Sequence, residues 1–356
     1  MKIIHTGDFH LGSPLQGLPK EKAALRGAEL LDGFRRLCLY ARENGVAAVL
    51  IAGDLFDGGK VKKSVYQEAF SAIAAAAPVC FFYVSGNHDE SFGYTDELPK
   101  NLYRFSDTRD WKSYDLPENI TITGVDGKYT DEGAFSRLVL RKERYNIVMA
   151  HGEFSLGERG GLSHLQNKAI DYLALGHIHI PMPKTSPLDG RGRYRYCGCL
   201  EGRGFDEVGA RGFFLLEIEN GKLCSDRFLS LAKREICMRE VDVSTCQNYY
   251  DVERVALAAL SDVREENLVK LLLKGRHRAD LRKDISLLTA RLSQRFFFVK
   301  TVDESRPFID YEAFAKDLSE RGEFVREVGR YELNEAEREE ILEIGFKALA
   351  GEEIDL

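Results

Sequence analysis

Five short apolar runs, rich in β-branched and aromatic residues, occur in the first half of the chain. They are Ile3-Ile4 and residues 49–52, 79–84, 147–150 and 172–175. Runs of this length, bounded by glycine or polar residues, are typical of strands that are buried on both faces. We therefore expect these five segments to be buried strands.

Helical patterns alternate with these strands. The apolar positions of the first helix share one face: Leu30, Phe34, Leu37, Cys38 and Ala41. Gly45 is placed to end this helix. A second helix, with Ser64 as its N-cap, is expected to run through Phe70 and Ile73 to Pro78. Alternation of this kind predicts an α/β domain.

The pattern changes after residue 179 to short strands and glycine-rich turns. Strands are expected at residues 194–197 and 213–218, and the Asn220-Gly221 dipeptide that follows is a hairpin signal. We interpret this region as the second half of a sandwich.

A smaller alternating unit begins near residue 235. The expected elements are, in order, a strand at 241–243, a helix at 252–260, a strand at 268–273, a helix with Leu281, Ile285, Leu288 and Leu292 on one face, a strand at 296–299 and acidic helices. Asn334 and Glu337 form the signature of a capping box for the last helix. With 356 residues and 44% hydrophobic content the chain is long enough for two domains, which we expect at 1–234 and 235–356.

Composition excludes some classes of protein. The sequence contains no run of 18 or more apolar residues, which is about the length needed to cross a bilayer. Met1-Lys2 leads straight into the first strand without the apolar region of a signal peptide. The seven cysteines are odd in number and lie mostly in apolar stretches, which indicates reduced thiols rather than a disulfide framework. We expect a soluble, cytoplasmic protein with no membrane partner.

Side chains that can bind metals follow each of the five apolar runs. The segments are Asp8-Phe9-His10, Gly53-Asp54, Gly86-Asn87-His88-Asp89, His151-Gly152-Glu153 and Gly176-His177-Ile178-His179. In a strand, residues i and i+2 point to the same side, so if the strand geometry persists to its end Asp8 and His10 can reach one metal, and His177 and His179 can likewise share a site. Mixed imidazole and carboxylate ligands suit Mn²⁺, Fe or Zn²⁺. A carboxylate that bridges two cations offsets their repulsion, and Asp54 is the natural bridge.

Each motif alone is weak evidence, because histidines in strands are often structural. Five motifs in one order, each after a predicted strand, make coincidence a poor explanation. Three histidines lie outside these motifs and have ordinary interpretations: His5 as a core residue, His164 as a loop residue and His277 as part of a solvated face. The segment 197–199, Cys-Gly-Cys, lacks partners at the spacing of a zinc site, so we expect structural thiols there.

The order of these motifs resembles that of the calcineurin-like metallophosphoesterase superfamily. Asp8-Phe9-His10-Leu11-Gly12 and Gly53-Asp54-Leu55-Phe56-Asp57 are similar to its SbcD-like DNA-repair exonuclease branch. Residues 202–207 also resemble a segment common in that branch, although the two cysteines before it depart from the branch's pattern. The resemblance covers the first two thirds of the chain by motif and the rest by layout. It implies a four-layer αββα sandwich with a smaller C-terminal α+β capping domain.

The resemblance implies a role for each motif residue. One metal ion would be held by Asp8, His10, Asp54 and His179, and the other by Asp54, Asn87, His151 and His177. His88 would contact the scissile phosphate and help the leaving oxygen depart, with Asp89 as its orienting partner. The reaction would be phosphodiester hydrolysis by a hydroxide that bridges two divalent ions, Mn²⁺ or alternatively Fe or Zn²⁺.

Charge is distributed unevenly along the chain, although the net charge is only −7. Residues 270–300 carry nine basic and two acidic side chains, whereas residues 301–356 carry seven basic and seventeen acidic ones. A solvated helix face is the usual explanation of a charge run, but beside a phosphoesterase site a basic segment favours a polyanionic substrate. The candidate DNA-binding residues are Lys270, Lys274, Arg276, Arg278, Arg282, Arg291 and Arg295.

The function we predict is that of a metal-dependent DNA exonuclease of DNA repair. In the family that the chain resembles, the capping domain helps to guide DNA and the partner is an SbcC-type coiled-coil ATPase. A homodimer is the other assembly that we consider. One alternative is a phosphomonoesterase or cyclic-nucleotide phosphodiesterase, because the same ligands serve small substrates across the superfamily. Another is a non-catalytic scaffold with a structural metal site, against which the intact His88 argues.

Overall fold

The computed structural model describes residues 1–356 apart from residues 16, 59–60, 90–97, 106–108, 128–131, 157–160, 279, 309 and 351–356. The last acidic residues of the tail therefore lie outside the described part. Packing divides the chain into two compact units: Met1–Met238 with Val263–Lys270 and Ser293–Val299, and Arg239–Asp262 with Leu271–Leu292 and Lys300–Leu356. The predicted domain boundary after residue 234 stays a prediction.

The first six-stranded sheet has the strand order β12-β11-β1-β2-β3-β4. β1, β2, β3 and β4 are parallel, whereas β11 runs antiparallel to β1 and to β12. The strands span Lys2–Thr6 (β1), Ala48–Ala52 (β2), Cys80–Val84 (β3), Leu102–Arg104 (β4), Phe213–Glu219 (β11) and Lys222–Leu229 (β12).

The second six-stranded sheet has the strand order β5-β6-β7-β8-β10-β9. β6, β7, β8 and β10 are parallel, and the edge strands β5 and β9 are antiparallel to their neighbours. The strands span Lys112–Leu116 (β5), Ile120–Gly124 (β6), Tyr145–His151 (β7), Tyr172–Gly176 (β8), Ser186–Pro187 (β9) and Arg193–Tyr196 (β10). The five predicted strands are thus β1, β2, β3, β7 and β8.

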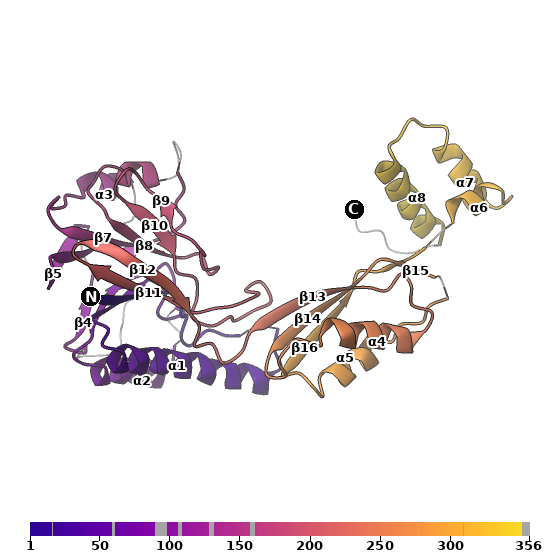
Figure 1. Ribbon diagram of the computed structural model, residues 1–356. Helices are drawn as coiled ribbons and strands as arrows, with labels where there is room; N and C mark the ends of the chain where they lie inside the picture. The colour runs from indigo at the N-terminus through magenta and orange to yellow at the C-terminus, as the bar shows by residue number, and fades with distance from the viewer. Residues whose placement is uncertain are drawn as a thin grey trace. The chain divides into compact units, whose positions relative to one another are not determined.

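Helices cover the outer face of each sheet. α1 (Lys20–Glu43) and α2 (Lys63–Ala75) lie along the first sheet, and α3 (Glu132–Arg137) and the 3₁₀ helix η2 (Leu162–Leu165) lie on the second (Figure 1). Successive residues of a strand point to opposite faces, which explains the layers. Ile4, Val49 and Ile51 pack in one core with Phe34 and Leu37 of α1.

The alternate residues of the same strands fill the space between the sheets. Ile3 and Leu50 pack there with Ile147 and Tyr172 from the second sheet. A third core lies on the outer face of the second sheet, where Leu173 and its neighbours meet α3 and η2. Three cores separate four layers, so the predicted αββα sandwich is confirmed. Each fully buried aliphatic side chain contributes about 1.5–3 kcal/mol to such a core.

The structure confirms the predicted hairpin turn and the predicted end of the first helix, but not the predicted N-cap of the second helix. Asn220 and Gly221 both adopt positive φ, 50° and 70°, and join β11 to β12 as predicted. Gly45, with φ 64°, follows the end of α1. The prediction that Ser64 caps α2 was wrong: the helix begins at Lys63, and the capping position is held by Lys62 without a side-chain hydrogen bond.

The C-terminal part of the chain contains two small sheets and five helices among the described residues. The sheets are ordered β13-β14-β16 and β15-β17. The strands span Ile236–Asp242 (β13), Leu268–Lys274 (β14), Arg276–His277 (β15), Phe298–Asp303 (β16) and Arg306–Pro307 (β17). The helices span Tyr249–Ala259 (α4), Ile285–Leu292 (α5), Tyr311–Ala315 (α6), Glu320–Val328 (α7) and Glu335–Ala350 (α8).

The last three helices pack around an apolar cluster of their own, formed by Val325, Val328, Leu342 and Phe346. The capping box at the start of α8 is confirmed. The Asn334 amide N–H donates to Glu337 Oε2 at 3.0 Å, and the Glu337 N–H donates to Asn334 Oδ1 at 2.9 Å. None of the described helices is both long and apolar enough to cross a membrane.

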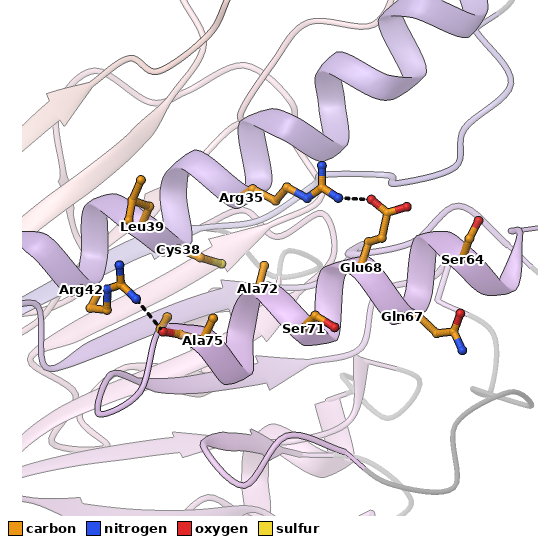
Figure 2. A pocket seen from close by; sticks show the side chains of 11 residues that line it. Arg35, Cys38, Leu39, Arg42, Ser64, Gln67, Glu68, Ser71, Ala72 and Ala75 are labelled. Atoms are coloured by element: carbon orange, nitrogen blue, oxygen red, sulfur yellow. Dashed lines mark hydrogen bonds and ion pairs between the residues drawn. The ribbon is translucent and has the colours of Figure 1, made fainter.

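An open groove lies between α1 and α2 (Figure 2). Arg35 forms an ion pair with Glu68 across it, and an Arg42 guanidinium N–H donates to the Ala75 carbonyl oxygen at 3.1 Å. The predicted site residues are not among those that line the groove. The chemistry of the protein is therefore not expected at this hollow.

Candidate metal centre

The motif residues follow the carboxyl ends of β1, β2, β3, β7 and β8. β1, β2 and β3 are parallel neighbours in one sheet, and β7 and β8 are parallel neighbours in the other. Parallel strands end at the same edge of a sheet, and ligands of α/β proteins bind beyond those ends. The topology therefore brings segments from positions 8 to 179 to one place.

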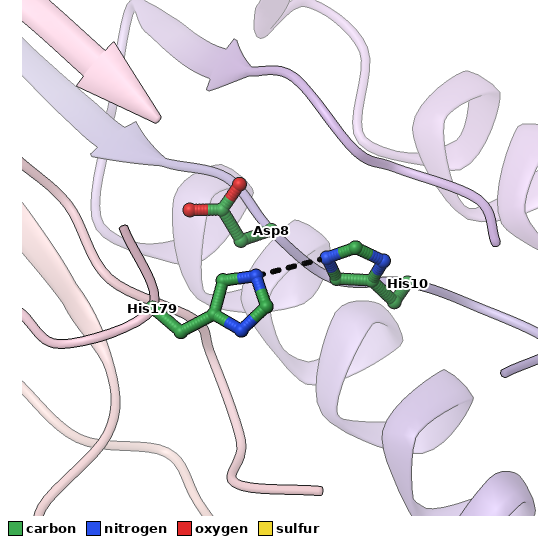
Figure 3. Close-up of side chains that lie close together, drawn as sticks. All are labelled: Asp8, His10 and His179. Carbon is green, nitrogen blue, oxygen red and sulfur yellow. Dashed lines mark hydrogen bonds between the residues drawn. The ribbon is translucent and has the colours of Figure 1, made fainter. Parts of the chain in front are cut away.

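A first group consists of Asp8, His10 and His179 (Figure 3). Nε2 of His10 lies 3.1 Å from Nε2 of His179. On the other side of each ring a carboxylate faces Nδ1: Asp57 Oδ1 at 3.1 Å from His10, and Glu207 Oε1 at 2.7 Å from His179. A carboxylate can only accept a hydrogen bond, so both rings carry their proton on Nδ1 when neutral and direct two Nε2 lone pairs at each other.

A second group consists of Asp54, His151 and His177, with Asn87 beside them. The Ala52 carbonyl oxygen lies 2.8 Å from His151 Nδ1, which places the proton of the neutral ring there. His151 Nε2 then faces Asn87 Oδ1 at 2.9 Å and Asp54 Oδ2 at 3.3 Å. The same Asn87 oxygen lies 3.1 Å from His177 Nδ1.

Asp54 connects the two groups. Its Oδ2 lies 3.5 Å from His10 Nε2 in the first group and 3.3 Å from His151 Nε2 in the second. Its Oδ1 accepts a hydrogen bond from the His88 amide N–H at 2.9 Å, which fixes the carboxylate. The structure therefore brings together all seven predicted ligands, with Asp54 in the position expected of a bridge.

The donor set fits divalent cations. Atoms that bind one ion at roughly 2.1 Å, at angles between octahedral and tetrahedral, lie about 3.0–3.4 Å from one another. The separations of His10 from His179 and of Asn87 from His151 and His177 are of this size, 2.9–3.1 Å. The Nε2 lone pairs of His10 and His179 converge without a hydrogen atom between them and repel, and a cation would remove that repulsion. Imidazole, carboxylate and amide oxygen together suit Mn²⁺, Fe or Zn²⁺.

The backbone at the predicted ligands is strained. Asp8, His10, Asp54 and His177 have positive φ of 50°, 47°, 48° and 99°. Non-glycine residues rarely occupy this region, which costs about 1–3 kcal/mol at each residue, and such strain clusters at functional sites. The core of the surrounding sandwich offsets that cost.

This strain corrects one prediction. β1 ends at Thr6 and β8 at Gly176, so the strand geometry does not persist to the ligands. Asp8 and His10 still meet, through left-handed turns, whereas His177 and His179 lie in different groups. The expectation that the two histidines share one site because of strand pleating was wrong.

Two motif glycines are required by close approach. A Cβ atom on Gly53 would lie 2.0 Å from His151 Nδ1, and one on Gly86 would lie 2.1 Å from Asp54 Oδ1. Any side chain at either position would displace a predicted ligand. This explains why glycine precedes Asp54 and Asn87 in the motifs.

His88 is held by a residue that the sequence analysis did not single out. Its Nδ1 lies 3.0 Å from Asp57 Oδ1, the oxygen that also faces His10, and its side chain is half exposed. Asp89 does not orient His88, contrary to the prediction. Its buried carboxylate instead accepts hydrogen bonds from the amides of Gly86, Leu55 and Phe56, at 2.8, 3.3 and 2.9 Å, and so holds the loop after β2.

Asp57 and Glu207 are the supporting residues that sequence reasoning missed. Both lie in segments quoted for the family resemblance, residues 53–57 and 202–207. A carboxylate that faces the second nitrogen of a ligand histidine is a recurrent feature of metal sites. That expectation could have directed attention to them, but it could not have told which histidine each would face.

Most of the candidate DNA-binding residues are ion-paired within their own unit. The pairs are Lys274 with Glu240 and Glu304, Arg276 with Glu339, Arg278 with Asp280, Arg291 with Glu253, and Arg295 with Glu265. Lys270 and Arg282 form no ion pair with any described residue. The excess of positive charge counted along the sequence is therefore largely compensated locally.

Burial and neighbouring charges shift the pKa values of five predicted ligands, and burial lowers those of His10 and His177. Burial raises the pKa of Asp8 to about 7. For Asp54, burial favours the neutral acid, but the hydrogen bond and charge of His151 and the charge of His10 outweigh it and bring the pKa to about 2. For His151, burial lowers the pKa, and the carboxylates of Asp54 and Asp8 outweigh it and raise the pKa to about 9. In the metal-free protein a proton on His151 takes the place of a cation.

Metal binding is therefore expected to release protons at pH 7. His151 must lose a proton to offer its lone pair, and Asp8 is about half protonated at that pH, so we expect more than one proton to leave per protein. Because these pKa values lie at or above 7, the apparent affinity should rise as the pH increases towards 9. Calorimetric titration with Mn²⁺ in buffers of different ionisation enthalpy measures this release. A His164→Ala variant should behave as the wild type, and release of no proton at pH 7 would contradict the assignment.

Comparison with known proteins agrees with this geometry. A family model described as calcineurin-like phosphoesterase matches residues 1–181, just over half of the chain. The uncharacterized metallophosphoesterase YhaO of Bacillus subtilis is 27% identical over 296 residues, which are 77% of this chain and 69% of that protein. The SbcD subunit of nuclease SbcCD from Staphylococcus epidermidis is 22% identical, covering 74% of this chain and 81% of the relative. The DNA double-strand break repair protein Mre11 of Methanopyrus kandleri is 26% identical, covering 68% and 59%. The chain therefore belongs to the calcineurin-like phosphoesterase family.

Proposed function

We propose that the protein is a two-metal-dependent phosphodiesterase that hydrolyses DNA. The observation that carries the proposal is the position of Asp54, whose Oδ2 borders both groups of ligand atoms. Two cations held by a shared carboxylate are a recurring device for phosphoryl transfer. The choice of DNA is supported by relatives named as a nuclease subunit and as a DNA repair protein, each similar over about two thirds or more of the chain.

The residues divide the task as follows. Asp8, His10 and His179 with Asp54 would hold one cation, and Asn87, His151 and His177 with Asp54 the other. Bound there, the ions would neutralise charge on the phosphoryl oxygens and make a water acidic enough to attack at neutral pH.

His88 lies next to both groups without belonging to the metal ligands we propose. Its ring packs edge-on to His10 at 4.8 Å between centroids, and the Asp57 carboxylate fixes it through Nδ1. As an imidazolium, His88 would keep one proton on Nδ1 towards Asp57 and deliver the other from Nε2 to the leaving oxygen of the phosphodiester. His88 would thus act on the leaving group, while the metal ligands act on the phosphate and the attacking water.

Further parts of the proposal follow from the family. Mn²⁺ is the proposed metal, with Fe or Zn²⁺ as alternatives that the ligand set also accepts. Residues 235–356 are proposed to contact DNA, and an SbcC-type ATPase is the proposed partner. Lys270 and Arg282 are the sharper probes of DNA contact, because acidic side chains already bind the other five candidates.

Parallel assays on three substrates test the function. With Mn²⁺ present, we expect cleavage of linear DNA at a rate that falls steeply with salt, and slower turnover of bis(p-nitrophenyl) phosphate. Arg282→Glu should weaken DNA cleavage and leave hydrolysis of the small substrate unaffected. The slope of log affinity for DNA against log salt concentration should become shallower by about 0.9 for each phosphate that the variant no longer neutralises. Circular single-stranded DNA reports whether a free end is required. Efficient hydrolysis of small phosphodiesters or monoesters alone, indifferent to Arg282, would favour the small-molecule alternative.

A further inference from the structure

We propose that the two metal positions are unequal, and that Glu207 is the positioning residue that makes the Asp8 position the tighter one. The inference rests on the proposed two-metal function and adds an order of binding to it. It follows from three features of the structure: the charges of the ligands, the groups behind the histidines, and the fixed geometry of Glu207.

The ligand charges differ between the two groups. The first group has a carboxylate of its own, Asp8, in addition to the shared Asp54. In the second group the corresponding oxygen comes from Asn87, a neutral amide. A dication in the Asp8 position therefore meets one more formal negative charge, in a site where Asp8 is fully buried and screening by water is weak.

The groups behind the histidines add to this difference. Both histidines of the first group are backed by carboxylates, His10 by Asp57 and His179 by Glu207. In the second group His151 is backed by the neutral carbonyl of Ala52. A carboxylate behind an imidazole fixes its tautomer and makes its free nitrogen a better metal ligand.

Glu207 is itself held rigidly. It is buried, and its Oε2 accepts a hydrogen bond from the Arg203 amide N–H at 2.7 Å. Its Oε1, the atom that faces His179, also accepts from Arg203 Nη2 at 3.0 Å. The Glu207 N–H donates to the Gly204 carbonyl oxygen at 2.9 Å, which closes the turn. The carboxylate therefore cannot swing away from His179 without breaking this loop.

The contact between Arg203 and His179 indicates that Glu207 determines which nitrogen of His179 carries the proton, in addition to supporting the loop. Arg203 Nη2 lies 3.1 Å from His179 Nδ1, and a guanidinium can only donate. With Glu207 present, the proton on Nδ1 points to the carboxylate at 2.7 Å. Without Glu207, Arg203 would donate to Nδ1, and the ring would carry its proton on Nε2, the nitrogen that must bind the metal. Loss of Glu207 should thus switch His179 to the wrong tautomer.

Calorimetric titration of the full chain with Mn²⁺, together with electron paramagnetic resonance of the bound ions, tests the inference. The wild type should bind one ion more tightly than the second. Glu207→Ala should weaken the tighter ion by about 10–100-fold and leave the weaker one nearly unchanged. Glu207→Gln, which keeps an acceptor oxygen but not the charge, should give a smaller loss. Asn87→Ala should weaken the second ion only, which assigns each binding step to its group.

Two further variants make the result specific. Asp206→Asn, an exposed neighbour in the same loop, is the matched control and should bind both ions as the wild type does. Arg203→Ala added to Glu207→Ala should recover part of the lost affinity, because no donor then competes for Nδ1. Arg203→Ala alone removes a positive charge near the ion and should itself raise the affinity, so the recovery must exceed that gain; a structural role of Glu207 predicts no excess. Thermal melting of each metal-free variant shows whether the fold is kept, and Glu207→Gln carries the test if the alanine variant unfolds.

The possible failures are distinguishable. If the wild type binds two ions and the Glu207 variants weaken both equally, weaken only the looser ion, or change neither, the inference is wrong while the proposed function stands. If the wild type binds fewer than two ions, the proposed function itself fails.

Discussion

Replacing Asp54 by alanine should remove both metal ions and reduce Mn²⁺-dependent hydrolysis to background. Its Oδ2 lies within 3.5 Å of a predicted ligand nitrogen in each group, so neither position keeps its full set of ligands without it. Two cations would also lose the negative charge that offsets their repulsion. We expect the metal content of the variant, measured by elemental analysis after loading with Mn²⁺, to fall from two ions per chain to below one.

Two controls make this result interpretable. Asp54→Asn keeps the shape of the side chain and should also lose metal, because the charge is what holds the pair together. Glu153→Gln changes an exposed acid next to His151, outside both groups, and should retain two ions. Retention of two ions by both Asp54 variants would refute the bridging assignment.

Replacing His88 by alanine should have the opposite profile: both ions bound, but hydrolysis of DNA slowed by about 10²–10⁴-fold. His88 lies outside the two groups that share Asp54, and it forms a third cluster of potential ligands with His10 and Asp57. Removing a proton donor matters most for a poor leaving group. The loss should therefore be much smaller with bis(p-nitrophenyl) phosphate, whose leaving group needs no proton.

Turnover and metal content, measured side by side, test this expectation. An equal loss with both substrates would exclude a role in protonating the leaving group, and loss of metal would make His88 a ligand. If the wild type and His88→Ala were both inert while folded and loaded with metal, the scaffold alternative would be the better account.

The buried strands and their alternation with helices could be predicted because those signals are local, whereas the four-layer sandwich was implied by the family resemblance. Runs such as residues 49–52 are apolar on both faces, and such a strand needs a layer on each side. The metal-binding side chains could be found because they follow those strands, and parallel strands end at one edge. The family resemblance then distributed the seven residues over two ions, and the structure gathers Asp8, His10 and His179 in one cluster and Asp54, His151 and His177 in another.

The pairing of the supporting residues could not be predicted. Asp57 faces His10 and His88, and Glu207 faces His179 across 28 positions of sequence. The contact of His10 with Asp57 follows a left-handed backbone conformation at His10 that no hydrophobic pattern encodes. Asp89 was assigned to its neighbour His88, yet its carboxylate turns inward to three backbone amides.

The basic run at residues 270–300 shows a second limit of prediction from sequence. Its charge was counted along the chain, whereas the structure places carboxylates from distant segments against it, for example Glu339 of α8 on Arg276 at 2.6 Å. Sequence order does not show such compensation. Exposed pairs of this kind contribute little to stability, about 0–1 kcal/mol each, but they reduce the field that a polyanion would meet.

Anomalous diffraction from crystals of the protein loaded with excess Mn²⁺ tests the central claim most directly. We expect two manganese peaks, one among Asp8, His10 and His179 and one among Asn87, His151 and His177, with Asp54 between them. A single peak, or peaks only elsewhere on the protein, would contradict the account.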